Sequence, residues 1–140
     1  MKQIGFTTTL ILIFCFAIFS QIKVEQNSSL KIDEFEMLTE CEEGARLDNF
    51  LIELSKNKNS KGMIIFRAKT ERENYRRLFR VDSYLYFREA DKSQISYLMS
   101  SNDKLKIELW TTSENSEIPD CKDCKIIKAT EFRNPINNKK

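Results

Sequence analysis

The chain has 140 residues, with 23 lysines and arginines, 21 aspartates and glutamates, and no histidine. A formal net charge of +2 is too small to steer the whole protein to nucleic acid or to a membrane surface, so any charge-based function must be local. The lack of histidine excludes Ser-His and Cys-His nucleophile pairs, and three glycines are too few for a nucleotide-binding loop, so we expect no enzyme and no cofactor.

The N-terminal segment has the pattern of a secretory signal peptide. Lys2 precedes an apolar run, residues 10–19, which ends at Ser20-Gln21. We therefore expect residues 1–20 to be removed on export, which places the protein in the periplasm or outside the cell with no membrane span left. The alternative is an uncleaved membrane anchor, for which the run is short. A lipoprotein is disfavoured because Leu12-Ile13-Phe14, before Cys15, lacks small residues.

The rest of the chain is predicted to be one domain. Residues 21–30 are polar and are expected to be a flexible lead-in, residues 31–132 form a single domain, and residues 133–140 are predicted to be a disordered tail. At the start of the domain, residues 30–35 alternate imperfectly and predict the first strand.

The stretch from residue 44 to residue 68 predicts the centre of the core. Four apolar residues in its first half are spaced at i, i+3, i+4 and i+7, which predicts one apolar stripe on a helix. They are Leu47, Phe50, Leu51 and Leu54. Glu42 and Glu43 suit the positive end of this helix. After a polar turn, the unbroken apolar run of residues 63–66 predicts a strand buried on both faces.

A second helix is predicted from Thr70 to about Phe87. Thr70 and Glu73 match a capping box, and the inner stripe consists of Leu78, Val81 and Leu85.

The C-terminal third predicts further strands. Residues 93–100 form the third strand and the alternating residues 105–111 the fourth, with a turn at Asn102-Asp103, so we expect the two strands to pair as a hairpin. Trp110 falls on the face opposite the apolar one, where it would cover a sheet edge or stack on a ligand. Residues 126–132 predict a short edge strand. The order β-α-β-α-β-β predicts an α+β two-layer sandwich, with two helices packed on one mixed sheet.

The second helix carries a basic outer side. Three arginines recur at i, i+4 and i+8, and two more stand close by: Arg72, Arg76 and Arg80, with Arg67 and Arg77. Guanidinium forks match carboxylates and phosphates, so this set predicts a site for an anionic ligand. The alternative is a solvated helix face, balanced partly by Glu71, Glu73 and Asp82.

Secretion would place Cys41, Cys121 and Cys124 in an oxidising compartment, where a structural disulfide is the default. A bridge from Cys41 to Cys121 or Cys124 closes a long loop, worth about 4–5 kcal/mol in the chain-entropy model against about 2 for the short loop, so we expect the long bridge. The alternatives are a redox motif at Cys121-Lys122-Asp123-Cys124, which lacks a preceding strand and a following helix, and a zinc site without histidine.

Four short stretches carry a resemblance to a known family. They are Lys31-Ile32-Asp33-Glu34-Phe35, Ala45-Arg46-Leu47-Asp48-Asn49-Phe50, Lys61-Gly62 before a strand, and Glu108-Leu109-Trp110. Through these four stretches, residues 31–112 resemble a group of small secreted bacterial proteins. They also resemble, more distantly, the OmpA-like (peptidoglycan-associated) domain.

The resemblance implies an α+β fold of the OmpA-like kind and a peptidoglycan ligand. In OmpA-like domains an arginine of the second helix and an aspartate after the preceding strand hold the diamino acid of peptidoglycan. Arg77, eight residues before Leu85, is the counterpart of that arginine, whereas the strand exit reads Phe66-Arg67-Ala68-Lys69 and has no aspartate. A cationic strand exit would attract the ligand's carboxylates and repel its ammonium.

Together these features predict a non-catalytic secreted protein of the cell envelope. Its expected ligand is an anionic group of peptidoglycan or of another envelope component, received by Arg77 with help from Arg67, Arg76 and Arg80. The alternative is a structural or protein-interaction module without a small ligand. No metal and no nucleic acid are expected as partners.

Overall fold

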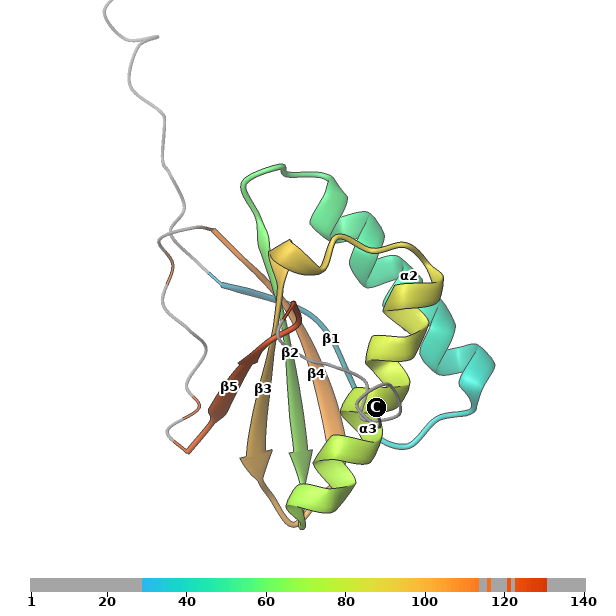
Figure 1. Ribbon diagram of the computed structural model, residues 1–140, viewed down its shortest axis with the longest axis vertical. Helices are drawn as coiled ribbons and strands as arrows, with labels where there is room; N and C mark the ends of the chain where they lie inside the picture. Colours follow the sequence, from blue (N-terminus) through green and yellow to red (C-terminus); the bar gives the residue numbers. More distant parts are fainter. Residues whose placement is uncertain (1–28, 114–115, 117–120, 122, 131–140) are drawn as a thin grey trace, which may run out of the picture.

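The structure is a computed structural model that describes residues 29–113, 116, 121 and 123–130 (Figure 1). The predicted signal peptide, nearly all of the lead-in and the tail lie outside the described residues. The elements are, in chain order, β1 (Leu30–Phe35), α2 (Glu40–Ser55), β2 (Lys61–Ala68), α3 (Glu71–Phe87), the short 3-10 helix η1 (Lys92–Gln94), β3 (Ile95–Ser101), β4 (Lys106–Thr112) and β5 (Lys125–Lys128). This order confirms the predicted α+β class, with β5 following as a short edge strand.

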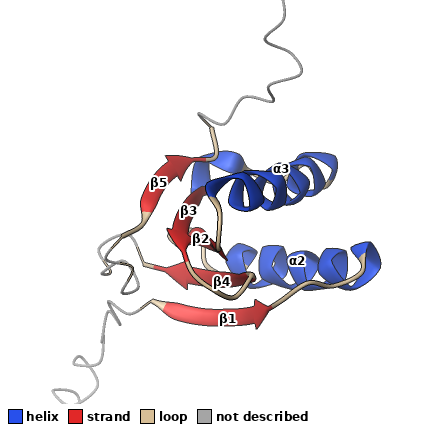
Figure 2. Cartoon of the chain, turned by 90° about the horizontal axis from the view of Figure 1, so that it is seen from below, coloured by secondary structure: helices blue, strands red, loops and turns tan. Residues whose placement is uncertain are grey.

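The five strands form one mixed sheet in the order β1-β4-β2-β3-β5, and both helices lie on the same face of it (Figure 2). Strands β2 and β3 are parallel, whereas β4 runs antiparallel to both β1 and β2. The predicted hairpin of β3 and β4 is therefore wrong, because β2 lies between them. The crossover connection through α3 makes β2 and β3 parallel neighbours. Strand β4 then pairs with the opposite edge of β2, so it does not contact β3.

Both long helices begin at a capping box. Thr39 accepts a hydrogen bond from the backbone N–H of Glu42, whose carboxylate accepts one from the Thr39 N–H at 3.1 Å. This cap starts α2 at Glu40, slightly before Glu42 and Glu43, where the helix was predicted to begin. The predicted box of Thr70 and Glu73 is confirmed at the start of α3.

The predicted stripes of the two helices meet the sheet. Leu47, Phe50 and Leu54 are buried in α2, and Leu78, Val81 and Leu85 in α3, while Leu51 is only half-buried. The β2 run of residues 63–66 is buried on both faces, as predicted. Ile64 and Phe66 belong to the core under the helices, and Met63 and Ile65 to a smaller cluster on the other side.

We call the side of the sheet away from the helices the open face. Its apolar cluster consists of Met63, Ile65 and Leu98, and is covered by Trp110, Cys121 and Cys124. Trp110 thus packs on the sheet opposite the helices, on the predicted face.

Cys121 and Cys124 form a disulfide, and Cys41 is exposed and unpaired. The expected long bridge from Cys41 is therefore wrong. Its physical reason is the position of the sheet: Cys41 is on α2, over the helix face, whereas the other two cysteines pack on the open face. The chain-entropy argument considers only the length of the closed loop. It does not account for the sheet, which separates Cys41 from Cys121 and Cys124.

Candidate functional site

The predicted arginine site centres on a buried carboxylate, Glu43 of α2, which lies between the two helices. Its side chain is 3% exposed and forms ion pairs with two arginines of α3: Arg77 Nη2 at 3.2 Å and Arg80 Nε at 3.0 Å. Because residues three apart on a helix share a face, Arg77 and Arg80 both reach the same acid on the neighbouring helix.

Arg77 is enclosed by the fold. Its side chain is 8% exposed, and its Nη2 also donates a hydrogen bond to the Glu36 carbonyl at 3.1 Å, in the loop before α2. Burial lowers the pKa of the Arg77 guanidinium, and the charge of Glu43 opposes this shift. Arg77 therefore joins α3 to α2 and to the loop after β1, and its Nη2 is bound within the fold.

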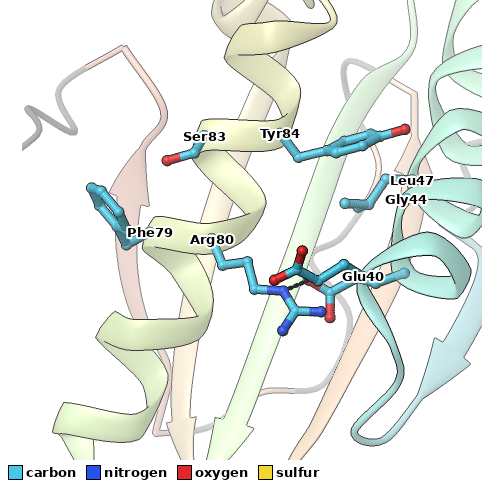
Figure 3. A pocket seen from close by; sticks show the side chains of 8 residues that line it. Glu40, Gly44, Leu47, Phe79, Arg80, Ser83 and Tyr84 are labelled. Carbon is cyan, nitrogen blue, oxygen red and sulfur yellow. Dashed lines mark ion pairs between the residues drawn. The ribbon is translucent and has the colours of Figure 1, made fainter.

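Arg80 lies at the edge of a cavity of about 400 Å³ between the helices (Figure 3). The cavity is lined by Glu40, Glu43, Gly44, Leu47, Phe79, Arg80, Ser83 and Tyr84. Tyr84 points toward α2, where its ring lies against Gly44, whereas Phe79 and Ser83 project from the side of α3 away from α2 (Figure 3). The Arg80 side chain is 36% exposed, so a ligand in this cavity can reach it.

Arg72 and Arg76 are exposed on the outer side of α3. Within the described ranges neither has an ion-pair or hydrogen-bond partner, and the acids predicted to balance this helix are engaged elsewhere. Glu71 pairs with Lys125 at 3.5 Å, and Glu73 caps the helix. Asp82 is buried and accepts hydrogen bonds from Lys92 and Tyr97. The guanidinium groups of Arg72 and Arg76 are therefore open to solvent and to a ligand.

Arg67 lies on the open face, apart from the other three. Its Nε donates a 2.7 Å hydrogen bond to Glu108, which is also bound by Lys106 at 3.0 Å and by the indole N–H of Trp110 at 3.1 Å. Burial raises the pKa of Glu108, but these three donors outweigh it and lower the pKa to about 2.

The structure thus separates the four predicted ligand-binding arginines into three places. Arg77 and Arg80 share Glu43, Arg76 is exposed on the outside of α3, and Arg67 is held on the opposite side of the sheet.

Sequence reasoning missed the two acids that bind these arginines, Glu43 and Glu108. Glu43 had a signal, because it stands four and seven residues before Leu47 and Phe50 and so continues their buried stripe. Glu108 had none, since it occupies an ordinary polar position of an alternating strand.

Comparison of the chain with protein-family models, with curated proteins and with solved structures gives no match. In the described part of the chain, no helix combines the length and the apolar character that crossing a bilayer requires. The same residues contain no group of three or more acidic or cysteine side chains placed to hold a metal ion.

Proposed function

We propose that the protein is a non-catalytic component of the cell envelope, periplasmic or secreted, that binds an anionic group through the outer side of α3. The observation that carries this proposal is the contrast among the arginines. Arg77 is neutralised inside the fold, while Arg72 and Arg76 are exposed and form no ion pair in the described residues, and Arg80 reaches the interhelical cavity.

The chemistry of the surface supports an anion rather than a cation. Guanidinium groups bind carboxylates and phosphates through two parallel N–H donors, and they remain charged at any physiological pH. In this proposal Arg76 and Arg80 contact the ligand. Arg77 acts through Glu43, which it holds in the orientation that positions Arg80. Arg67 does not belong to this surface, although it was among the predicted residues.

The buried acids support a role in binding rather than catalysis. Asp82 and Glu108 are each held by cationic and hydroxyl or indole donors, and Glu43 by two guanidinium groups. A general acid or base near neutral pH needs a pKa near the working pH, whereas Glu108 is held to about 2. These carboxylates therefore act as structural counter-ions.

Cosedimentation with purified peptidoglycan sacculi tests the proposal. We expect the wild type to sediment with sacculi, and Arg76→Ala and Arg80→Ala each to weaken binding by about tenfold or more, the effect of losing a charge-assisted hydrogen bond. Lys58→Ala, at an exposed position in the turn before β2, removes the same charge away from α3 and should bind as the wild type does. Equal binding by all variants would remove this site.

The alternative proposal is a protein-interaction module. Its support is the C-terminal edge of the sheet, where β5 has only four residues and the side chain of Ile126 is 54% exposed. Crosslinking in envelope extracts should then recover a stable protein neighbour, and Ile126→Glu should abolish the crosslink. Recovery of no neighbour contradicts this alternative.

A further inference from the structure

The outer side of α3 carries aromatic rings among its unpaired arginines. Six side chains at helical spacings lie along it, and we call this set the basic-aromatic surface: Arg72, Arg76, Phe79, Ser83, Tyr86 and Phe87. Figure 3 shows Phe79 and Ser83 on the side of the helix away from α2. The surface extends over most of α3, roughly 22 Å along the helix axis.

The aromatic end of this surface is unusually open to solvent. Tyr86 is 76% exposed and Phe87 is 78% exposed, more than any other large apolar side chain in the described residues. Lys92 Nζ, which pairs with Asp82, lies 5.7 Å from the centroid of the Tyr86 ring. Leaving two large rings in water forgoes several kcal/mol of possible burial, which is typical of a surface that meets a partner.

The charge on the surface is complementary to an anionic partner. Arg72 and Arg76 have no acidic partner in the described ranges, and Asp82, the only acid of the middle of α3, points inward to Tyr97. The exposed acids near the two ends of the helix are Glu71, paired with Lys125, Glu73, engaged in the cap, and Glu89 beyond the C-terminus. The centre of the surface is therefore positive.

We propose that this surface docks the protein on a bilayer that contains anionic phospholipid. The inference rests on the proposed function, because it names the phosphate-bearing partner of the same helix. Guanidinium groups bind lipid phosphates. Phe and Tyr rings favour the headgroup region of a bilayer, which is apolar on the side of the acyl chains and hydrated on the side of the solvent. A helix face that mixes both residue types fits a flat, fluid surface.

Vesicle flotation with the full chain tests the inference. The probes are vesicles of phosphatidylcholine alone and vesicles of phosphatidylcholine mixed with phosphatidylglycerol. Residues 10–19 are apolar and can enter either bilayer, so binding is scored as the difference between the two kinds of vesicle. We expect a preference for the anionic vesicles that falls about tenfold or more in the double variant Arg72→Gln, Arg76→Gln, since each basic residue contributes about 1 kcal/mol near such a surface.

Two further variants complete the design. Tyr86→Ser with Phe87→Ser should weaken flotation while leaving its salt dependence intact, because the rings contribute no charge. Lys58→Gln with Lys104→Gln removes two positive charges from exposed turns and should float as the wild type does. Circular dichroism checks that each variant keeps the fold.

The inference is overturned if the wild type shows no preference for anionic vesicles, or if the two double variants that remove charge behave alike. It is also overturned if single-stranded oligonucleotide displaces the protein from the vesicles at a lower phosphate concentration than added phosphatidylglycerol vesicles do. If sacculi bind through Arg76 and Arg80 while vesicles do not bind, the inference fails and the proposed function stands. If neither binds, both fail.

Discussion

The hydroxyl group of Tyr97 on β3 donates a 2.7 Å hydrogen bond to the carboxylate of Asp82 on α3, inside the core between helix and sheet. Lys92, in the 3-10 helix before β3, binds the same carboxylate oxygen at 2.6 Å. Burial and the charge of Asp82 together raise the pKa of Tyr97 far above its ordinary value, so the phenol stays a donor at every physiological pH.

Tyr97→Phe should therefore lower the free energy of unfolding by about 1–2 kcal/mol. The substitution removes one of two donors to Asp82 and leaves Lys92 in place, so the carboxylate is not left without a partner. Urea denaturation measures the change. Tyr86→Phe, at a side chain that is 76% exposed, is the control and should change nothing. Equal stability of Tyr97→Phe and the wild type would contradict the structural role of this bond.

Glu43→Gln should be more costly, by about 3 kcal/mol or more, because it leaves the buried Arg77 guanidinium without its counter-ion. Glu53→Gln, which removes a surface pair with Lys56, should cost less than about 1 kcal/mol. In an Arg77→Met background the cost of Glu43→Gln should be much smaller. Undiminished cost in that background would show that the two residues are not coupled.

Acid should destabilise the protein partly through Glu108. In the folded state its pKa is about 2, against an ordinary value of 4.5, so the unfolded chain takes up this proton first as the pH falls. Stability is present above the unfolded pKa and is lost from about pH 5 downward, with a total contribution of up to about 3 kcal/mol. Thermal melts across this range should show a flatter profile for Glu108→Gln than for the wild type. Parallel profiles would contradict the shifted pKa.

The two described glycines should respond differently to alanine. A Cβ on Gly62 would lie 2.8 Å from Phe50 Cζ and 3.2 Å from Leu54 Cδ2, in the packed core, so Gly62→Ala should cost about 1–3 kcal/mol. At Gly44 the nearest atom is the ring edge of the half-buried Tyr84, at 2.9 Å. There the gain of about 1 kcal/mol in helix propensity offsets the contact. A larger loss at Gly44 than at Gly62 would contradict this ranking.

Thiol labelling tests the cysteine pairing. Iodoacetamide should modify Cys41 in the native protein, and Cys121 and Cys124 only after reduction, as read by peptide mass spectrometry. Reduction should also change the fluorescence of Trp110, because both sulfur atoms belong to the group that covers the same apolar cluster. A Cys41 peptide linked to either of the other cysteines would contradict the structure.

Periodicity alone was sufficient for the helices and for the faces of the strands, because burial follows the repeat of 3.6 or 2 residues. It predicted Leu47, Phe50 and Leu54 on one helix, and Ile107 opposite Trp110 on one strand. It could not identify the neighbours of β4, since an alternating pattern defines which face is buried and not which strand supplies the hydrogen bonds.

The arginines show the same limit at the level of a site. Arg76 and Arg77 are adjacent in the sequence, yet a step of one residue turns the side chain by about 100° around the helix, from solvent toward α2. The partner that occupies Arg77 comes from another helix, and the partner of Arg67 from another strand. These acidic partners can be identified only when the tertiary packing is known. The spacing of the arginines therefore predicted a basic helix, but it could not show which arginines have no acidic partner.

Among the strands that the structure describes, β1 pairs with β4 alone, from Leu30 opposite Thr111 to Phe35 opposite Ile107. The first strand of the domain to be synthesised is thus without its sheet partner until nearly the whole domain has been made. The sheet is therefore closed at this edge by a pairing of high sequence separation, which is formed late and slows folding.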